Sequence, residues 1–118
     1  MMYEDIKQYC LSKAGAYQDC PFGPFPICFK VGNRIFLEWY PQDEKITVRC
    51  EPMLADHYRH IYPGTVIAGY HCPDIQKPYK NTVYLNREVS DGLIYDMIDH
   101  SYEEAFKRLN RKERENIL

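Results

Sequence analysis

The chain has 118 residues, of which 45% are hydrophobic and 27% are charged, and this size and composition are typical of one globular domain. Its formal net charge of −2 argues against strong, sequence-independent binding to nucleic acid and leaves a local basic face as the alternative. No apolar run approaches the roughly 20 residues of a membrane helix, and the acidic start is unlike a signal peptide. We therefore expect a cytoplasmic protein.

The N-terminal segment predicts a helix followed by a stiff loop. Apolar residues recur at helical spacing over residues 3–14, and Gly15 suits the C-terminus of such a helix. Residues 21–26 contain three prolines and are expected to form an ordered loop, because proline cannot continue a helix.

Three strands follow as a meander. Residues 27–31, 34–40 and 45–50 alternate between apolar and polar side chains, and Gly32-Asn33 is typical of a two-residue hairpin turn. Such a sheet has one apolar face, which helices must cover.

The second half predicts two more helices and a further strand. A helix starts at Pro52 and stops at Pro63, because proline fits the first helical turn and ends a helix elsewhere. Residues 64–80 are expected to be a long loop with a short strand near Val66, and residues 82–85 a strand. Ser90 is a typical N-cap for the last helix.

Together these elements predict an α+β fold with an antiparallel sheet. We expect a single domain over residues 1–109, followed by a charged C-terminal tail over residues 110–118 that frays.

Cysteine and histidine spacing does not predict a metal site. The five cysteines are odd in number and contain no Cys-x-x-Cys pair, which argues against a disulfide framework or a zinc ribbon. Cys10, Cys28 and Cys50 lie where a small apolar residue would serve, so we expect them in the core. His57 and His60 lack further ligands beside them, and we predict neither a metal nor a cofactor.

Residue patterns typical of catalysis are missing from the chain. No glycine-rich phosphate loop or dinucleotide fingerprint occurs, and the sequence places no activating partner beside any cysteine. The carboxylates of the last helix are interpreted as its solvated face. We predict no enzymatic activity and no catalytic residue.

The polar phrase Asp99-His100-Ser101-Tyr102 lies in the middle of the last predicted helix, where serine and histidine are not strong helix formers. The favoured interpretation is structural: Tyr102 packs inward, and Ser101 or His100 bonds to loop backbone, for example at Tyr70-His71. The alternative is a small polar pocket. Its members would be Tyr70, His71, Asn81, His100 and Tyr102.

Basic residues near aromatic ones have the composition of a nucleic-acid surface, where charge holds phosphate and rings stack on bases. The competing interpretation is an ordinary solvated face. The candidate nucleic-acid contacts are Lys30, Arg34, Lys45, Arg49, Lys77, Tyr79 and Lys80.

A series of short phrases, in a fixed order over residues 5–109, resembles the MmcQ/YjbR family of small bacterial proteins. The phrases are Cys20-Pro21-Phe22-Gly23-Pro24, Phe29-Lys30-Val31-Gly32-Asn33-Arg34-Ile35-Phe36, Arg49-Cys50-Glu51-Pro52, Tyr62-Pro63-Gly64, Gly69-Tyr70-His71, Asn81-Thr82-Val83 and Asp99-His100-Ser101-Tyr102. Family members typically carry a His-Trp pair before the Asn-Thr-Val phrase, whereas this chain has Pro78-Tyr79-Lys80, so Tyr79 is the aromatic residue left there.

The resemblance implies a CyaY-like or secretion-chaperone-like α+β arrangement and non-enzymatic, weak DNA binding through a hairpin and a loop. In this chain the hairpin is residues 30–34 and the loop is residues 77–81. Two alternatives remain open from the residues: a protein-interaction or chaperone-like module, favoured by the acidic balance and eleven tyrosines, and a small-ligand-binding domain.

Overall fold

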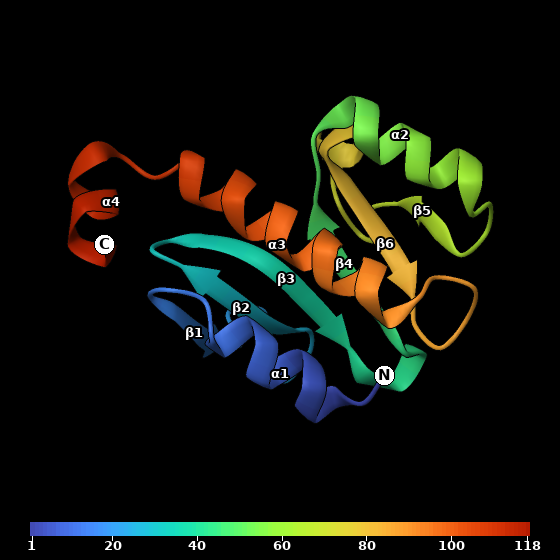
Figure 1. Ribbon diagram of the computed structural model, residues 1–118, viewed down its shortest axis with the longest axis horizontal. Helices are drawn as coiled ribbons and strands as arrows, with labels where there is room; N and C mark the ends of the chain where they lie inside the picture. The colour runs from blue at the N-terminus through green and yellow to red at the C-terminus, as the bar shows by residue number, and fades with distance from the viewer.

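The computed structural model describes residues 1 to 118 and places six strands in one antiparallel sheet, in the order β1-β2-β3-β4-β6-β5 (Figure 1). The strands are β1 (Ala16–Asp19), β2 (Ile27–Val31), β3 (Arg34–Tyr40), β4 (Lys45–Arg49), β5 (Val66–Ala68) and β6 (Lys80–Tyr84). The helices are α1 (Tyr3–Leu11), α2 (Pro52–Ile61), α3 (Asp91–Lys107) and α4 (Arg111–Ile117), with 3₁₀ turns η1 (Pro41–Asp43) and η2 (Asp74–Tyr79). The predicted α+β class is confirmed.

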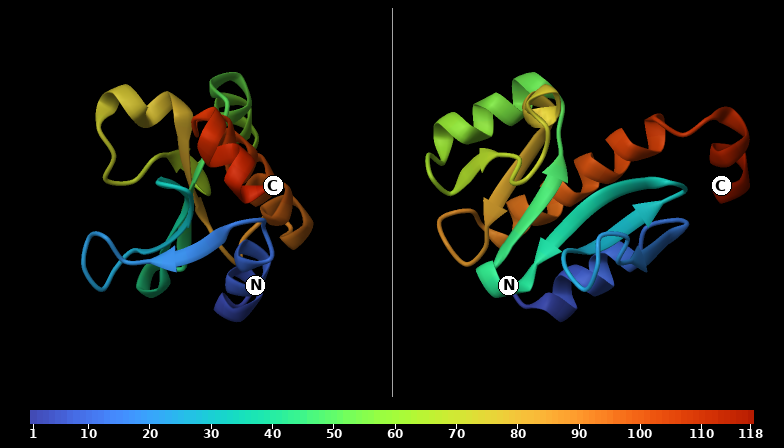
Figure 2. Two further views of the ribbon diagram at one scale, coloured as in Figure 1. Left: turned by 90° about the vertical axis from the view of Figure 1, so that its left-hand side faces the viewer. Right: turned by 180° about the vertical axis from the view of Figure 1, so that it is seen from behind.

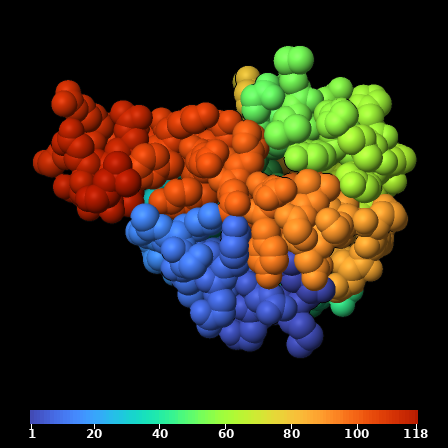
Figure 3. All heavy atoms as spheres, viewed as in Figure 1, coloured from blue at the N-terminus to red at the C-terminus, as the bar shows by residue number.

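Helices α1, α2 and α3 cover one face of the sheet, and two loops project from the other (Figure 2, left). From the helix side these helices hide most of the sheet (Figure 3). Ile46 and Val48 of β4 and Val83 of β6 form one buried cluster with Ile94 and Ile98 of α3. Burying an aliphatic side chain stabilises a fold by about 1.5–3 kcal/mol. The helix-covered face therefore holds the core. The other face is called here the open face.

Helix α3 is tied to its neighbours through the polar phrase at its centre. Asp99 accepts a hydrogen bond from the Tyr9 hydroxyl of α1 at 2.5 Å and pairs with Lys13. The Tyr102 hydroxyl donates to the backbone oxygen of Ala14 at 2.6 Å. These bonds support the structural interpretation of the phrase.

The N-terminal segment differs from the prediction. Helix α1 ends at Leu11, where Ser12 caps it and its hydroxyl donates to the Tyr9 oxygen at 2.6 Å. Gly15 has φ of +70° and forms the turn into β1, a strand that was not predicted. With four residues, β1 is too short to show a clear alternation, and its pairing with β2 defines it.

The C-terminal segment was expected to fray, and this expectation is wrong. Residues Arg111–Ile117 form α4 (Figure 1). Asn110 and Glu113 form a reciprocal capping box at its start. Ile117 packs against the core, and a Cβ built on Gly15 would lie 3.0 Å from its side chain. A cap and one apolar anchor thus hold a helix whose other residues are polar.

The remaining local predictions concern cysteines, histidines and the membrane. Cys10, Cys28 and Cys50 are buried as predicted, and burial raises the pKa of each thiol to about 12. His57 and His60 are exposed on α2, and nowhere do three potential metal-binding side chains of histidine, cysteine, aspartate or glutamate cluster. None of the helices is both long and apolar enough to span a membrane.

Candidate nucleic-acid interface

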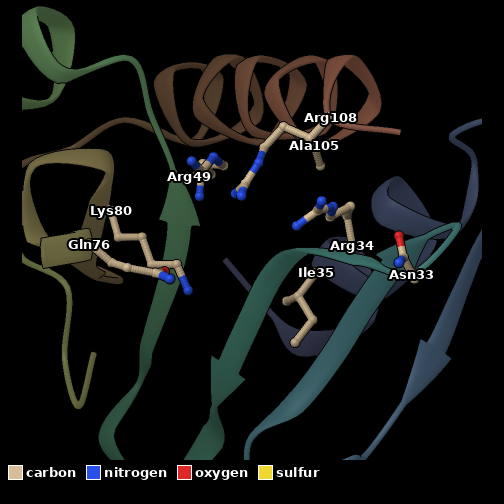
Figure 4. A pocket seen from close by; sticks show the side chains of 8 residues that line it. All are labelled: Asn33, Arg34, Ile35, Arg49, Gln76, Lys80, Ala105 and Arg108. Atoms are coloured by element: carbon tan, nitrogen blue, oxygen red, sulfur yellow. The ribbon is translucent and has the colours of Figure 1, made fainter. Parts of the chain in front are cut away.

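The candidate site lies where two neighbouring strands of the sheet separate. β3 and β4 pair from Tyr40 and Lys45 as far as Leu37 and Val48. Beyond these residues the start of β3 and the end of β4 diverge, and α3 lies behind the opening (Figure 4). The separation creates a wedge-shaped recess on the open face.

Ser101 of α3 closes the back of this recess. Its hydroxyl donates to the Phe36 oxygen of β3 at 2.5 Å and accepts the Arg49 N–H of β4 at 2.8 Å. The Ser101 side chain is completely buried, so no water can replace it without rearrangement. The serine thus satisfies the backbone groups that the strands would have used to pair with each other. The predicted bond to Tyr70-His71 is replaced by this bond to the sheet.

The recess is a cavity of about 190 Å³ that we call the arginine wedge (Figure 4). Its lining residues come from β3 and its turn, β4, η2, β6 and the end of α3. They are Asn33, Arg34, Ile35, Arg49, Gln76, Lys80, Ala105 and Arg108.

Three guanidinium groups, those of Arg34, Arg49 and Arg108, point toward one another in the wedge (Figure 4). None of the three forms an ion pair with a carboxylate. The Nε of Arg34 is buried without a hydrogen-bond partner. Burial is the main cause that lowers the pKa of Arg49, and Arg108 lowers it further; Glu104 opposes this shift, and Arg34 adds a smaller lowering effect. Clustered cations without a counter-charge are the electrostatic signature of an anion site.

The remaining polar groups of the wedge extend the site toward the open face. Lys80 is 3.8 Å from Glu38, a loose pair. The guanidinium carbon of Arg49 lies 5.5 Å from the ring centroid of Tyr79, within the range of a cation–π contact. Guanidinium groups bind phosphate through two parallel hydrogen bonds, and Arg34 and Arg49 are free to do so here.

Of the predicted nucleic-acid contacts, the structure brings four together. Arg34, Arg49 and Lys80 line the wedge, and Tyr79 lies beside Arg49. Lys30 is instead held by Asp19 at 3.3 Å, and Lys77 by Asp74 at 2.8 Å. These two lysines have counter-charges of their own.

Lys45 is the predicted contact that the structure removes. Its side chain points to the open face, as the alternation predicted, but it is only 5% exposed. Its ammonium lies 3.2 Å from the ring centroid of Tyr70, within 6 Å of the rings of Tyr40 and Tyr84, and 3.4 Å from Asp43. A loop from a distant part of the sequence covers it, so Lys45 cannot reach a nucleic acid.

The polar pocket considered as the alternative does not form. Asn81 and His100 line a cavity of about 10 Å³ on the helix side, where His100 accepts the Glu51 N–H at 3.1 Å. Tyr70 packs over Lys45 on the open face, with His71 against its ring. The Tyr102 hydroxyl donates its hydrogen bond to the backbone oxygen of Ala14. The five residues therefore divide among separate places, because the sheet lies between the two histidines.

Sequence reasoning missed Gln76, Asn33 and the role of Arg108 in the site. Arg108 follows Ser101 by seven positions, so the two share one face of a helix. This spacing is a signal that could have placed Arg108 at the wedge. No local pattern places Gln76 there, because the fold of η2 brings it beside Lys80 of β6 (Figure 4).

Comparison with known proteins agrees with this architecture. A single antiparallel sheet with helices on one face defines an α+β protein, and the sequence profile of YjbR matches residues 11–104. The chain therefore belongs to the YjbR family.

Two curated relatives and two solved structures are similar to this chain. The uncharacterized protein YjbR of Escherichia coli K12 is 26% identical over 120 residues, covering 100% of this chain and 98% of the relative. The uncharacterized protein YbdF of Escherichia coli O157:H7 is 26% identical over 121 residues, covering 98% and 93%. DR2400 of Deinococcus radiodurans, described as a DUF419 domain, has a TM-score of 0.87 at 21% identity, over 97% of this chain and 86% of its own. A Pseudomonas syringae protein has a TM-score of 0.72 at 19% identity, over 89% and 99%. At these identities the two structures show the fold alone.

Proposed function

We propose that this protein binds nucleic acid through the arginine wedge and catalyses no reaction on it. The observation that supports this most strongly is the meeting of Arg34, Arg49 and Arg108 without any carboxylate partner. Repulsion among these cations is relieved when a phosphate binds between them.

The neighbourhood of the wedge favours a nucleic acid over a small free anion. Tyr79 is 43% exposed beside Arg49, so a phosphate bound in the wedge leaves an aromatic ring next to it. The resemblance to the MmcQ/YjbR family, which is described as DNA-binding, supports the same choice. With a net charge of −2, the protein attracts phosphate only locally, and we expect weak binding that salt abolishes.

The test compares charge removal inside and outside the wedge. Arg34→Gln and Arg49→Gln each remove one wedge cation, whereas Arg87→Gln removes an exposed arginine on the loop that follows the far end of β6. The probe is a fluorescein-labelled 12-nucleotide DNA strand at low salt, read by anisotropy. We expect roughly tenfold weaker binding for each wedge variant, because a charge-assisted hydrogen bond contributes about 1.5–3 kcal/mol.

The control variant Arg87→Gln should bind within about twofold of the unaltered protein, since its arginine is remote from the wedge. Equal losses in all three variants, or no binding by the unaltered protein, would refute the proposed function.

A further inference from the structure

A second cavity, of about 460 Å³, adjoins the wedge on the open face. It lies between the loop that joins β1 to β2 and the loop that leads into η2, the two loops that project away from the helices (Figure 2, left). We call it the aromatic pocket. The lining residues that matter here are Phe22, Phe25, Glu38, Tyr40, His71 and Lys80.

The two phenylalanines of this pocket are exposed to solvent. Phe22 is 65% exposed and Phe25 is 45% exposed. Pro21, Pro24 and Pro26 fix the backbone around them, since each proline ring locks its φ angle. The rings are therefore presented on a stiff loop, and stiff aromatic side chains lose little entropy when a ligand binds.

Lys80 lines both the arginine wedge and the aromatic pocket, so the two cavities are adjacent. One is basic and the other is lined by four aromatic rings, the combination by which proteins hold the backbone and the bases of an unpaired strand. In a duplex both faces of each base are already stacked, and the base cannot enter a recess between two loops.

We propose that the aromatic pocket binds a base of single-stranded nucleic acid whose neighbouring phosphate lies in the arginine wedge. This inference rests on the proposed function and names its ligand as a single strand. Phe22, Phe25 and His71 contact the face of the base. Glu38, whose carboxylate is 13% exposed and accepts the Tyr40 hydroxyl at 3.1 Å, keeps an acceptor for a base amino group.

Three labelled ligands of twelve units separate the contributions of base and phosphate. They are a single strand of deoxycytidines, an abasic single strand with the same number of phosphates, and a duplex. The base-binding variant is Phe22→Ser combined with Phe25→Ser. The matched control is Ile75→Ser, which removes an apolar side chain that is 82% exposed on η2 and lines neither cavity.

We expect the unaltered protein to bind the deoxycytidine strand at least fivefold more tightly than the abasic strand or the duplex, as one stacked base allows. The double serine variant should bind both single strands equally, at the abasic level, while Ile75→Ser retains the preference. Circular dichroism checks that the variants fold.

Equal binding of the deoxycytidine and abasic strands by the unaltered protein would overturn this inference and leave the proposed function standing. Tighter binding of the duplex than of the deoxycytidine strand would also overturn this inference. Absence of binding to every ligand would refute the proposed function, and this inference with it. Sedimentation equilibrium adds a further check, because a dimer that the double serine variant dissociates would make the pocket a protein interface instead.

Discussion

Lys45 and Arg49 begin and end the same strand and point to the same face of the sheet, yet their surroundings are opposite. At the Lys45 end, three tyrosine rings and Asp43 surround a buried ammonium. At the Arg49 end, two more guanidinium groups gather, and no carboxylate pairs with any of them.

The contrast distinguishes Lys45, whose charge is compensated within the fold, from Arg49, which we propose binds a ligand. A buried charge is tolerated when partners compensate for the water it has lost, as the rings do for Lys45. Arg49 has only the Tyr79 ring, at 5.5 Å, and no carboxylate pair, and burial and the two neighbouring arginines lower its pKa. Under the proposed function, the phosphate of a bound nucleic acid supplies the missing counter-charge.

The largest effect is expected from the residue that holds the Arg49 end open. Ser101→Ala leaves the Arg49 N–H and the Phe36 carbonyl buried without partners, and each such group costs about 1–3 kcal/mol. We expect the free energy of unfolding to fall by about 2–4 kcal/mol in urea titrations. Ser12→Ala removes an exposed serine that also bonds to backbone, and it should cost less than about 0.5 kcal/mol. A loss below about 1 kcal/mol for Ser101→Ala would mean that the serine does not hold the strands apart.

The second prediction compares substitutions of Lys45 and Arg49 directly. Lys45→Ala should lower the free energy of unfolding by about 2–3 kcal/mol, because it removes a desolvated cation–π contact and the packing of the side chain. Its affinity for a DNA strand should not change. Arg49→Gln should keep or raise the stability while it weakens binding. Thermal unfolding and anisotropy on the same samples distinguish these outcomes, and an Arg49→Gln variant as unstable as Lys45→Ala would contradict the distinction.

The smallest effect is expected for the ion pair between Lys13 and Asp99 of α3. Burial alone would raise the pKa of Asp99, but hydrogen bonds from Lys13 and Tyr9 outweigh it and lower the pKa. Because the folded pKa lies below the unfolded value, this contribution is present above the unfolded pKa of roughly 3.9 and is lost as the pH falls through the folded pKa.

Asp99→Asn should therefore reduce the loss of stability on acidification. The change should be less than about 1 kcal/mol, because the pair is partly exposed. Asp96→Asn, at an exposed position of the same helix that forms no ion pair, is the control for urea titrations across the acid range. Identical acid profiles for Asp99→Asn and the unaltered protein would show that the pair with Lys13 contributes nothing.

The sequence predicted what local patterns determine. Gly32 has φ of +57° in the hairpin turn, and the Ser90 side chain accepts the Leu93 N–H at the start of α3, both as predicted. The alternation along β4 also gave the correct directions of Lys45 and Arg49. The exposure of these residues depended on which loop folded over them, and no local pattern contains that information.

The site was predicted in part for the same reason. Arg34, Arg49 and Lys80 could be selected from composition and resemblance, but their meeting depends on the divergence of β3 from β4, which Ser101 permits. Residues Arg111–Ile117 show the opposite case, because their capping signal is local and was overlooked.

The most direct test of the arginine wedge is the salt dependence of single-strand binding. The slope of log affinity against log salt is about −0.7 for each phosphate neutralised on a single strand. We expect the Arg34→Gln, Arg49→Gln double variant to lose about 0.7 from the steepness of the slope, since the one phosphate held in the arginine wedge is no longer neutralised. Arg87→Gln should retain the slope of the unaltered protein. A double variant with the unaltered slope and affinity would contradict the assignment of the arginine wedge as the phosphate-binding site.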